Sequence, residues 1–528
     1  MGQLHGKETP MSVIINATSA KLTSALGRVK EGDRANLVLV IFSGEKLAGP
    51  ALAADELTGG LISRRIEQDG FEPKFVQTKV IDSDLTIAGL DRIILIGLGP
   101  RNKLTLNGLR SVLAEAFTTA RDVAGSENLI FPLIDVDLHG FTVQQFAQAV
   151  TEYGVLADYE PNHFKTKPWR EEAERTHLQT LTLLCSSHTL SAAKKGLNAG
   201  LLFAEATNRA RDMVNLPSDK MTPAKIAGIA RKIAKDSEGL VKVQVLKKAQ
   251  MKKLGMNGVL AVSSGSQFEP AFIMLSYDPP TIGATKEVLG LVGKGVTFDS
   301  GGLNVKDDDG MRDMKMDMAG AAAVLQAMSL IVALKPQISV RAVVAACENM
   351  IDSKSMRQGG IITSMSGLTI EIDHTDAEGR LTLADALHYI QEVGQANQLV
   401  DVATLTGDVE YALGGLITGV FGNNERFTRN FMRCAKDAGE AMHECPMPDE
   451  LRINNKGRMA DLTNSPEGPG HIAAAWFLRE FVQEGNSWIH LDIAGTGFRR
   501  HEHGADPEGG TGVATRSLAQ LLRQYSKI

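Results

Sequence analysis

The residues best suited to chemistry in this sequence are two carboxylates and an arginine in residues 373–381 (DHTDAEGRL). Alternating polar and apolar residues at 369–372 predict a strand, and a helical pattern begins where the motif ends. If the strand geometry persists, Asp376, Glu378 and Arg380 point to the same side. Such groups are costly to desolvate unless they bind something, and a metal ion is the usual ligand. A solvated strand-to-helix turn with an acidic cap is the plainer alternative.

A second segment, residues 292–302 (VGKGVTFDSGG), follows another apolar run and carries Lys294 and Asp299. A lysine among glycines first suggests a phosphate loop, but the Walker pattern needs Ser or Thr directly after the lysine, where Gly295 stands. Further on, Asp317 precedes a run of small residues that predicts a helix packed closely on a sheet. Asp317 could simply cap that helix, so its role stays open at this point.

Together these segments would bring four carboxylates and one amine to the carboxyl ends of strands, where α/β sheets bind ligands. Four carboxylates without cations would repel one another and largely protonate, and two divalent ions relieve that repulsion. Lys306 and Arg380 would then be cations near the metals, placed to stabilise an oxyanion. The candidate metal ligands are Lys294, Asp299, Asp317, Asp376 and Glu378.

Several motifs, taken in order, resemble those of the leucine aminopeptidase (cytosol aminopeptidase) family. They are VGKGVTFDSGG, the spaced Lys306, an M-x-x-D-M-x-G-A-A-A-V run ending at Val324, and HTDAEGRL, which the family usually writes NTDAEGRL. Further landmarks are CENM at 347–350, DVATLTG at 401–407 and HLDIAGT at 490–496. The similarity covers the chain from about residue 199 to the C-terminus. It is weak before that point, where the family carries a smaller α/β domain of macro-like topology.

The resemblance implies a site with two divalent ions, most often zinc, with manganese, magnesium or cobalt as options at one position. Lys294 matches a lysine that ligates one metal, and Asp299 and Glu378 match carboxylates shared by both. Asp317 belongs with the Lys294 metal and Asp376 with the other. A ligating lysine must be neutral, so a nearby dication has to lower its pKa by several units from about 10.4.

By the same resemblance, the chain is a metal-dependent aminopeptidase that removes N-terminal residues from short peptides. A metal-bridged hydroxide would attack the scissile carbonyl. Lys306 would bind the developing gem-diolate oxygen, and Arg380 would hold a bicarbonate ion that acts as general base. Met314 and Thr404 match positions lining the pocket for the first side chain, which implies an apolar, leucine-like preference. The family assembles as hexamers, so a homo-hexamer is expected.

Three features depart from the family pattern: His374, the acidic run at 307–309, and Gly497 and Phe498 in place of the usual Ala-Trp. His374 stands where asparagine is usual. Histidine can bind metals, but a loop-shaping role is the favoured interpretation. The acidic run at 307–309 replaces less acidic residues and could raise metal affinity or attract basic substrates, although a solvated charge run is the default interpretation.

The elements that must position these residues predict a two-domain α/β protein. In the first part, apolar runs predict strands that alternate with helices, as in a mostly parallel sheet. The strands are expected at 36–42, 74–81, 92–96 and 177–185, and the helices at 107–123 and 141–156. A helix at about 199–214 marks the domain change.

In the second part, near-continuous apolar runs predict a mostly parallel sheet covered on both faces. The strands are expected at 241–246, 258–262, 271–277, 287–293, 338–346, 399–403 and 488–493. We therefore expect a macro-like N-terminal domain at 1–190. A dimetal aminopeptidase domain at 191–528 would follow, starting with the connecting helix.

Composition agrees with a cytoplasmic enzyme. At 528 residues, 43% of them hydrophobic, the chain can fill two cores. The 4 cysteines form no C-x-x-C pair, so reduced thiols in the cytosol fit best. The N-terminus has no apolar signal region, and no uninterrupted apolar run of membrane-spanning length is found, so no membrane partner is expected.

Two other functions stay open. A dimetal phosphoester hydrolase would share several of the carboxylates, but such sites favour magnesium with oxygen ligands and leave a lysine ligand unexplained. Some bacterial members of the family also bind DNA as architectural factors. The net charge of −6 disfavours nucleic acid as a partner here, and peptides are the expected substrates.

Overall fold

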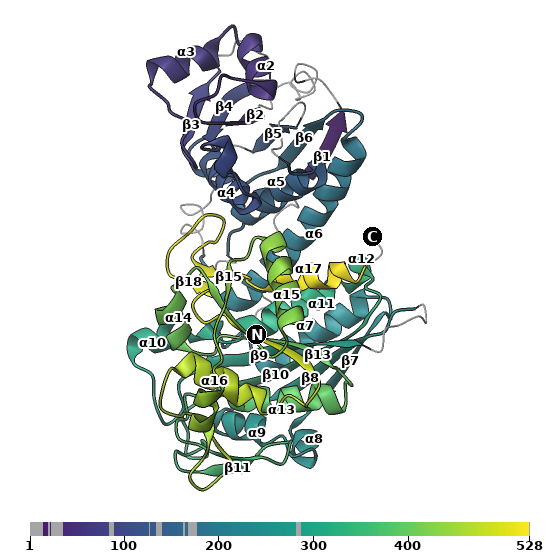
Figure 1. The fold of residues 1–528 in the computed structure, drawn as a ribbon, viewed down its shortest axis with the longest axis vertical. Helices are drawn as coiled ribbons and strands as arrows, with labels where there is room; N and C mark the ends of the chain where they lie inside the picture. Colours follow the sequence, from purple (N-terminus) through teal and green to yellow (C-terminus); the bar gives the residue numbers. More distant parts are fainter. Residues whose placement is uncertain are drawn as a thin grey trace. The chain divides into compact units, whose positions relative to one another are not determined.

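The computed structural model describes residues 14–19, 22, 35–83, 89–125, 127–133, 140–161, 164–166, 177–280 and 287–526. They form two compact units with separate sheets (Figure 1). One unit comprises Met1–Glu205 and Glu502–Pro507, and the other comprises Ala206–His501 and Glu508–Ile528. Helix α6 (Leu190–Asn215) contributes residues to both, so the units divide within the predicted connecting helix. The predicted two-domain α/β class is confirmed.

The N-terminal unit contains a six-stranded sheet in the order β1-β6-β5-β2-β4-β3, parallel except that β3 runs antiparallel to β4. Its strands are β1 (Ile14–Ser19), β2 (Ala35–Ile41), β3 (Thr78–Asp82), β4 (Leu90–Gly97), β5 (Asn128–Pro132) and β6 (Thr180–Cys185). Its helices are α2 (Gly49–Leu57), α3 (Leu61–Gln68), η1 (Arg101–Lys103), α4 (Leu106–Asp122) and α5 (Val143–Ala157). The six elements predicted before residue 190 are all present.

Both faces of this sheet are covered, which explains its continuous apolar strands. Alternate residues of β2 belong to different cores: Val38 packs with residues of α4 and α5, whereas Leu37 and Leu39 pack with residues of α2 and α3. The sequence reasoning missed β1, β5, α2 and α3.

The second unit is built on an eight-stranded sheet in the order β15-β14-β17-β13-β9-β10-β8-β7. The four central strands, β17, β13, β9 and β10, are parallel, and antiparallel pairings join them to the strands towards each edge. The strands are β7 (Val241–Leu246), β8 (Ala271–Tyr277), β9 (Val288–Asp299), β10 (Ser339–Asn349), β13 (Gln398–Ala403), β14 (Thr418–Gly422), β15 (Met442–Glu444) and β17 (Ser487–Asp492).

Two small sheets and a set of helices complete this unit. The sheets are formed by β11 (Ile361–Thr363), β12 (Thr369–Glu371) and β16 (Leu462–Thr463), and by β18 (Phe498–Arg499) and β19 (Gly509–Gly510). The helices are α7 (Pro223–Asp236), α8 (Lys248–Lys253), α9 (Asn257–Val262), η3 (Ser263–Gly265), α10 (Asp308–Arg312), η4 (Met314–Met316), α11 (Ala319–Ser329), α12 (Ile331–Leu334), α13 (Gly379–Glu392), α14 (Gly407–Leu413), α15 (Glu425–Ala438), η5 (Asp449–Asn455), α16 (Gly470–Arg479) and α17 (Thr515–Gln524).

Helix α11 lies against the central strands at backbone distance, as its small residues predicted. A Cβ atom on Gly320 would lie 2.0 Å from the carbonyl oxygen of Val402 in β13, and one on Gly293 in β9 would lie 2.7 Å from the Gly320 oxygen. The helical stretch Met314–Leu334 is long and apolar enough to cross a membrane, with a mean hydropathy of 1.7. However, 83% of its most apolar window is buried inside the protein, as expected for a core helix.

The strand predicted at 258–262 is wrong, because these residues form α9. The carboxylate of Asp385, which is fully buried in α13, accepts a hydrogen bond from the Val259 amide (3.0 Å) at the start of α9. A Cβ on Gly258 would lie 2.2 Å from the carbonyl oxygen of Leu381, so the two helices touch at backbone distance. Periodicity alone does not distinguish helix from strand in this short apolar run, and the tertiary contact with α13 selects the helix.

Candidate metal centre

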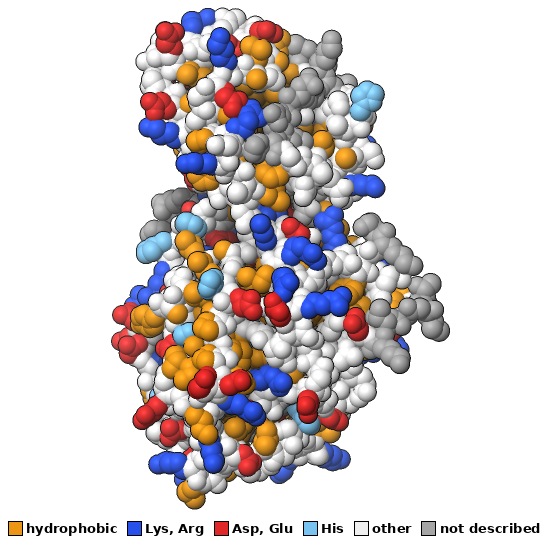
Figure 2. Space-filling view, in the orientation of Figure 1, with side chains coloured by type: hydrophobic (Ala, Val, Ile, Leu, Met, Phe, Trp, Pro, Cys, Tyr) orange, Lys and Arg blue, Asp and Glu red, His pale blue; other side chains and the backbone are white. Residues whose placement is uncertain are grey.

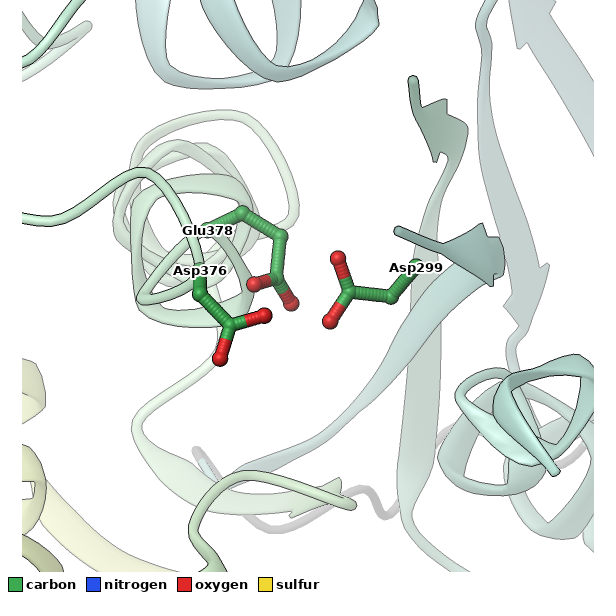
Figure 3. Close-up of side chains that lie close together, drawn as sticks. All are labelled: Asp299, Asp376 and Glu378. Atoms are coloured by element: carbon green, nitrogen blue, oxygen red, sulfur yellow. The ribbon is translucent and has the colours of Figure 1, made fainter. Parts of the chain in front are cut away.

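Three carboxylates meet at the carboxyl end of the central strands. Asp299 is the last residue of β9, Asp376 lies in the loop between β12 and α13, and Glu378 directly precedes α13. Figure 3 shows the three side chains pointing towards one another. Each offers one oxygen atom, and these oxygens lie within 4.8 Å of one another. The predicted place of the site, at strand ends of a parallel sheet, agrees with this position.

The local geometry that brings Asp376 and Glu378 together differs from the prediction. An extended strand through both residues was expected, but β12 already ends at Glu371 and the chain then turns, with the Ala377 amide donating to the His374 oxygen (3.2 Å). Glu378 has helical torsion angles, φ −76° and ψ −37°. The two carboxylates therefore converge because of a turn and a helix start, and the two-residue spacing on a strand is the wrong explanation.

The Lys294 side of the site is fully enclosed. Lys294 lies within β9, which runs further than the predicted 287–293, and only 3% of its side chain is exposed. Its Nζ atom lies 2.7 Å from Asp317 Oδ1 and 2.9 Å from Glu378 Oε1. It also donates a hydrogen bond to the Thr404 carbonyl oxygen (2.8 Å). The lysine predicted as a metal ligand thus joins two of the predicted carboxylate ligands.

Gly379 makes room for this lysine. A Cβ atom on Gly379 would lie 2.6 Å from Lys294 Cε and 2.7 Å from Nζ. These distances are well below van der Waals contact, so any other residue at the start of α13 would displace the lysine. The glycine of the D-A-E-G motif is therefore required by the packing of Lys294.

The charge of Lys294 is governed by its carboxylate neighbours. Burial lowers the pKa of this amine, but Asp317, Glu378 and Asp299 outweigh burial and raise it. Burial also raises the pKa of Asp317 well above its usual value, against the lowering effect of Lys294. Divalent cations among these carboxylates would reverse the sign of the local field, which is the condition for a neutral, ligating lysine.

The Lys306 side of the site is more open. Lys306 follows the Gly301–Gly302 turn, and its Nζ atom lies 2.9 Å from Asp299 Oδ2 and 2.5 Å from Asp376 Oδ1. The Lys306 side chain is 18% exposed, against 3% for Lys294. Burial lowers the Lys306 pKa, but the surrounding carboxylates outweigh it and raise the value, so this side chain is a cation at neutral pH.

Asp376 faces both charge signs. Burial, followed by Asp299 and Glu378, raises the pKa of its carboxyl group to about 7, although Lys306 acts in the opposite direction. This carboxyl group therefore keeps its proton up to about neutral pH. Such a raised pKa is expected where several acids lie close together and need cations to stay ionised.

Arg380 lies in the first turn of α13 and is buried. Its Nε atom is buried and has no hydrogen-bond partner among the described residues. Burial lowers the pKa of the guanidinium to about 10, while Glu378, Asp492 and Asp408 act to raise it. It remains a cation at neutral pH and keeps a free donor, which suits an anion from solution.

The two predicted pocket residues lie next to Asp317. Met314 is half-buried in η4, three residues before Asp317. Thr404 directly follows β13, and its hydroxyl donates a hydrogen bond to Asp317 Oδ1 (2.7 Å). Thr404 therefore orients a candidate metal ligand, a contact that sequence reasoning did not identify. Asp317 does not cap α11, whose first turn has no side-chain cap.

Asn349 is a further site residue that sequence reasoning missed. It is the last residue of β10, and its side-chain amide donates to Asp299 Oδ1 (2.8 Å) and to the Thr375 carbonyl oxygen (3.2 Å). It therefore connects the strand that carries Asp299 to the loop that carries Asp376. The CENM motif contained this asparagine, but no pattern in the sequence indicated its partners.

The acidic run at 307–309 has a local structural role. The Asp307 carboxylate accepts a hydrogen bond from the Gly310 amide (2.7 Å) and caps α10, while Asp308 and Asp309 occupy its first turn. Acidic side chains are favourable at the positive end of a helix dipole. The default interpretation as an exposed charge run fits this placement.

The donor set fits divalent cations. Asp317 Oδ2 and Glu378 Oε2 are buried and have no hydrogen-bond partner within the described part of the chain. A buried carboxylate oxygen without a partner is costly, and a bound cation removes that cost. Four carboxylates with one amine nitrogen match the oxygen and nitrogen ligands that zinc, manganese and cobalt accept.

Comparison with known proteins identifies the family of this chain. Residues 208–519 match the family described as "Cytosol aminopeptidase family, catalytic domain", and residues 38–168 match "Cytosol aminopeptidase family, N-terminal domain". A probable cytosol aminopeptidase of Alkaliphilus metalliredigens is 39% identical over 475 residues, which cover 90% of this chain and 93% of the relative.

Two solved structures have the same fold over nearly the full length. A mutant of tomato leucine aminopeptidase matches with a TM-score of 0.84 and 29% identity, covering 98% of each chain. The bottromycin maturation enzyme BotP in complex with Mn matches with a TM-score of 0.80 and 32% identity, covering 93% of this chain and 99% of that one.

Proposed function

The chain belongs to the cytosol aminopeptidase family and is a divalent-metal-dependent aminopeptidase, and from this premise we propose that it removes apolar, leucine-like N-terminal residues from short peptides. The main support is the convergence of Asp299, Asp376 and Glu378 on one point, with Lys294 and Asp317 directly beside them. A site of this composition suits divalent cations, and membership of the family supports peptide hydrolysis as its reaction.

We propose two metal ions in the site, with zinc as the resident metal and manganese, magnesium or cobalt as alternatives at one position. Lys294 and Asp317 would hold one ion and Asp376 the other, with Asp299 and Glu378 shared between them. When bound, the ions would act as Lewis acids for a carbonyl group and lower the pKa of a water molecule. The manganese complex recorded for the BotP structure supports a divalent ion in this fold.

Lys306 is proposed to stabilise negative charge on the substrate. It is cationic, partly exposed and held by Asp299 and Asp376 at the open side of the site. An ammonium group placed where an oxyanion develops stabilises the transition state more than the ground state. Lys306 would therefore donate to the carbonyl oxygen as its charge grows.

Arg380 is proposed to hold a bicarbonate ion, which would serve as the general base. The support is a buried guanidinium with an unpaired Nε donor at the start of α13. No histidine contributes to the cluster of acidic and lysine side chains described above, so an exogenous base explains how a proton is removed from water. Arg380 would orient that base and stay charged throughout.

Met314 and Thr404 are proposed to line the pocket for the first side chain. Met314 offers a flexible apolar surface that accepts branched aliphatic groups. The Thr404 hydroxyl already donates to Asp317, so it offers no free hydrogen-bond donor to a substrate side chain. Both features favour an apolar residue at the substrate N-terminus.

We also propose a cytoplasmic homo-hexamer that acts on peptides and not on nucleic acid or membranes. On the face in Figure 2, lysine and arginine side chains are interspersed with aspartate and glutamate, without one continuous basic area. The net charge of −6 supports the same view. Sedimentation velocity would test the assembly, and a stable monomer at micromolar concentration would contradict it.

The decisive experiment pairs metal analysis with a substrate panel. The purified protein should contain up to two divalent ions per chain and should hydrolyse leucyl-p-nitroanilide faster than lysyl- or glutamyl-p-nitroanilide. p-Nitrophenyl phosphate, assayed in parallel, should not be turned over. Turnover of the phosphate ester alone would contradict the proposal, and equal rates on all aminoacyl substrates would contradict the apolar preference.

A further inference from the structure

The loop that carries Asp376 is held in place by a residue far along the chain. Asn464 directly follows β16, and its side chain is fully buried. Its backbone amide donates to the Glu371 oxygen (3.0 Å) at the end of β12, which places its side chain beside the loop. Within the described residues, the hydrogen bonds of the Asn464 side chain all go to backbone atoms of the loop, and none goes to a candidate metal ligand.

The side-chain amide of Asn464 makes four hydrogen bonds to that loop. Its Oδ1 atom accepts from the amides of Asp373 (2.8 Å) and His374 (3.2 Å). Its Nδ2 atom donates to the carbonyl oxygens of His374 (2.7 Å) and Ala377 (3.3 Å). An asparagine amide can accept two and donate two hydrogen bonds, so its full capacity is used on backbone groups that flank Asp376.

His374 supports the same loop from its outer side. Its side chain is exposed, and its Nδ1 atom accepts a hydrogen bond from the Asp376 amide (3.3 Å). In an Asx turn, an Asn or Asp oxygen accepts from the backbone amide two residues later. An imidazole protonated on Nε2 can accept at the same position. This accounts for a histidine where the family signature has asparagine.

We propose that Asn464 and His374 are positioning residues of the metal centre, which fix the backbone of residues 373–377 and thereby aim the Asp376 carboxylate at Asp299 and Glu378. The proposal rests on the metal site of the proposed function and deepens it. Neither residue binds the metal. Their effect is on how well the ligands are prearranged, and groups that orient metal ligands typically change metal affinity or activity by about 10- to 100-fold.

Substitution of Asn464 by aspartate separates this role from general stability. Asn464→Asp keeps the Oδ1 acceptor but places a second oxygen against the carbonyl oxygens of His374 and Ala377, where two donors are needed. The matched control is Asn455→Asp: Asn455 is also buried, and its amide donates to the Ala473 oxygen (3.0 Å) in a different part of the unit.

A pair of His374 variants tests the turn itself. His374→Ala removes the acceptor for the Asp376 amide, whereas His374→Asn restores one by an Asx turn. His443→Ala, at an exposed histidine in β15, is the control for loss of a surface imidazole. If asparagine restores Mn²⁺ affinity where alanine does not, the acceptor for the Asp376 amide is what matters. A histidine needed only for its bulk, or as a metal ligand, would not be replaced by asparagine.

The measurement is the Mn²⁺ affinity of the metal-stripped full-length chain by titration calorimetry, with melting curves in EDTA as the stability readout. We expect Asn464→Asp to weaken Mn²⁺ binding by about 10- to 100-fold and Asn455→Asp to leave it within about twofold, even if both melt earlier. His374→Ala should weaken binding several-fold, while His374→Asn and His443→Ala should stay within about twofold of the parent.

Equal affinities for Asn464→Asp and Asn455→Asp would overturn the role of Asn464, and equal losses for His374→Ala and His374→Asn would overturn that of His374. If Asn464→Asp does not fold, the exposed His374 pair decides. Mn²⁺ binding is independent of turnover. A chain that binds Mn²⁺ as expected but hydrolyses no peptide would contradict the proposed function and leave this inference standing.

Discussion

Lys294 and Lys306 each contact two carboxylates of the same cluster, yet the structure treats them differently. Lys294 lies inside a central strand and is sealed by Asp317, Glu378 and a backbone oxygen. Lys306 follows a glycine turn and keeps 18% of its side chain in contact with solvent. The enclosed amine has no access to a substrate and is a candidate metal ligand, whereas the open one can reach a substrate. Access, and not residue type, separates a candidate ligand from a candidate catalytic group.

The largest loss of activity and metal is expected on substitution of Glu378, which lies between the two lysine environments. Glu378 contacts Lys294 directly and lies in the cluster that contains Asp299 and Asp376. Glu378→Gln keeps the size of the side chain but removes its charge, so activity should fall to background and both ions should be lost. Metal analysis after gel filtration and a leucyl-p-nitroanilide assay check this. A variant that retains both ions would show that Glu378 is not shared between the two sides.

Lys306→Ala should affect only the open side. We expect kcat to fall by about 10²- to 10³-fold, as when an oxyanion donor is removed, with the metal content unchanged. Steady-state kinetics together with metal analysis would test the prediction. Loss of both ions, or a change in KM alone, would place Lys306 in the binding of metal or substrate and not in stabilisation of the oxyanion.

Gly379→Ala should affect mainly the enclosed side. Its Cβ would lie 2.6 Å from Lys294 Cε, so the lysine must move. Forced overpacking costs about 1–3 kcal/mol of stability, and we expect metal affinity to fall by about 10- to 100-fold, as for other changes that displace ligands.

The control for that variant is Gly228→Ala in α7, where a Cβ meets nothing within 4 Å. Because alanine favours helix over glycine by up to about 1 kcal/mol, this variant should be neutral or slightly more stable. Urea unfolding and titration calorimetry measure both quantities. If both variants have the same stability and the same metal affinity, the contact between Gly379 and Lys294 does not matter for either quantity.

The last prediction is a pH dependence of stability on the open side. The Asp376 pKa is raised from 3.8 to about 7, first by burial and then by Asp299 and Glu378. Between these values the unfolded chain holds fewer protons than the folded one, so stability falls as pH rises.

Asp376→Asn removes this titration. In EDTA, its stability relative to the parent should therefore rise by up to about 1.4 kcal/mol per pH unit between about pH 4 and pH 7, and then level off. Urea unfolding of both proteins across this range is the measurement. A difference that stays constant with pH would contradict the raised pKa.

Much of the fold followed from the sequence because the signals are strong and local. Long apolar runs predicted β7, β8, β10, β13 and β17, and the small residues before Val324 predicted the close approach of α11 to the sheet. The predicted motif residues also meet, at the carboxyl end of β9, although Asp376 and Glu378 reach that point from a turn and a helix start and Asp317 follows η4.

The remaining features depend on contacts between residues far apart in sequence. The start of α9 is paired with Asp385, more than a hundred residues later, and the turn that carries Asp376 is set by Asn464, about ninety residues later. No local pattern contains this information. The extended geometry expected for residues 376–378 failed for that reason, because the side chain that bends the loop belongs to a different segment.

The seating of α11 has a consequence for how this chain can vary. Gly293 and Gly320 bring backbone against backbone, so the position of the segment before α11, which includes Asp317, is set by main-chain atoms and not by the fit of interchangeable side chains. In a library randomised across β9 and α11, aliphatic core positions should accept many combinations. The two glycines should remain glycine in all active clones, because they set the distance between helix and sheet.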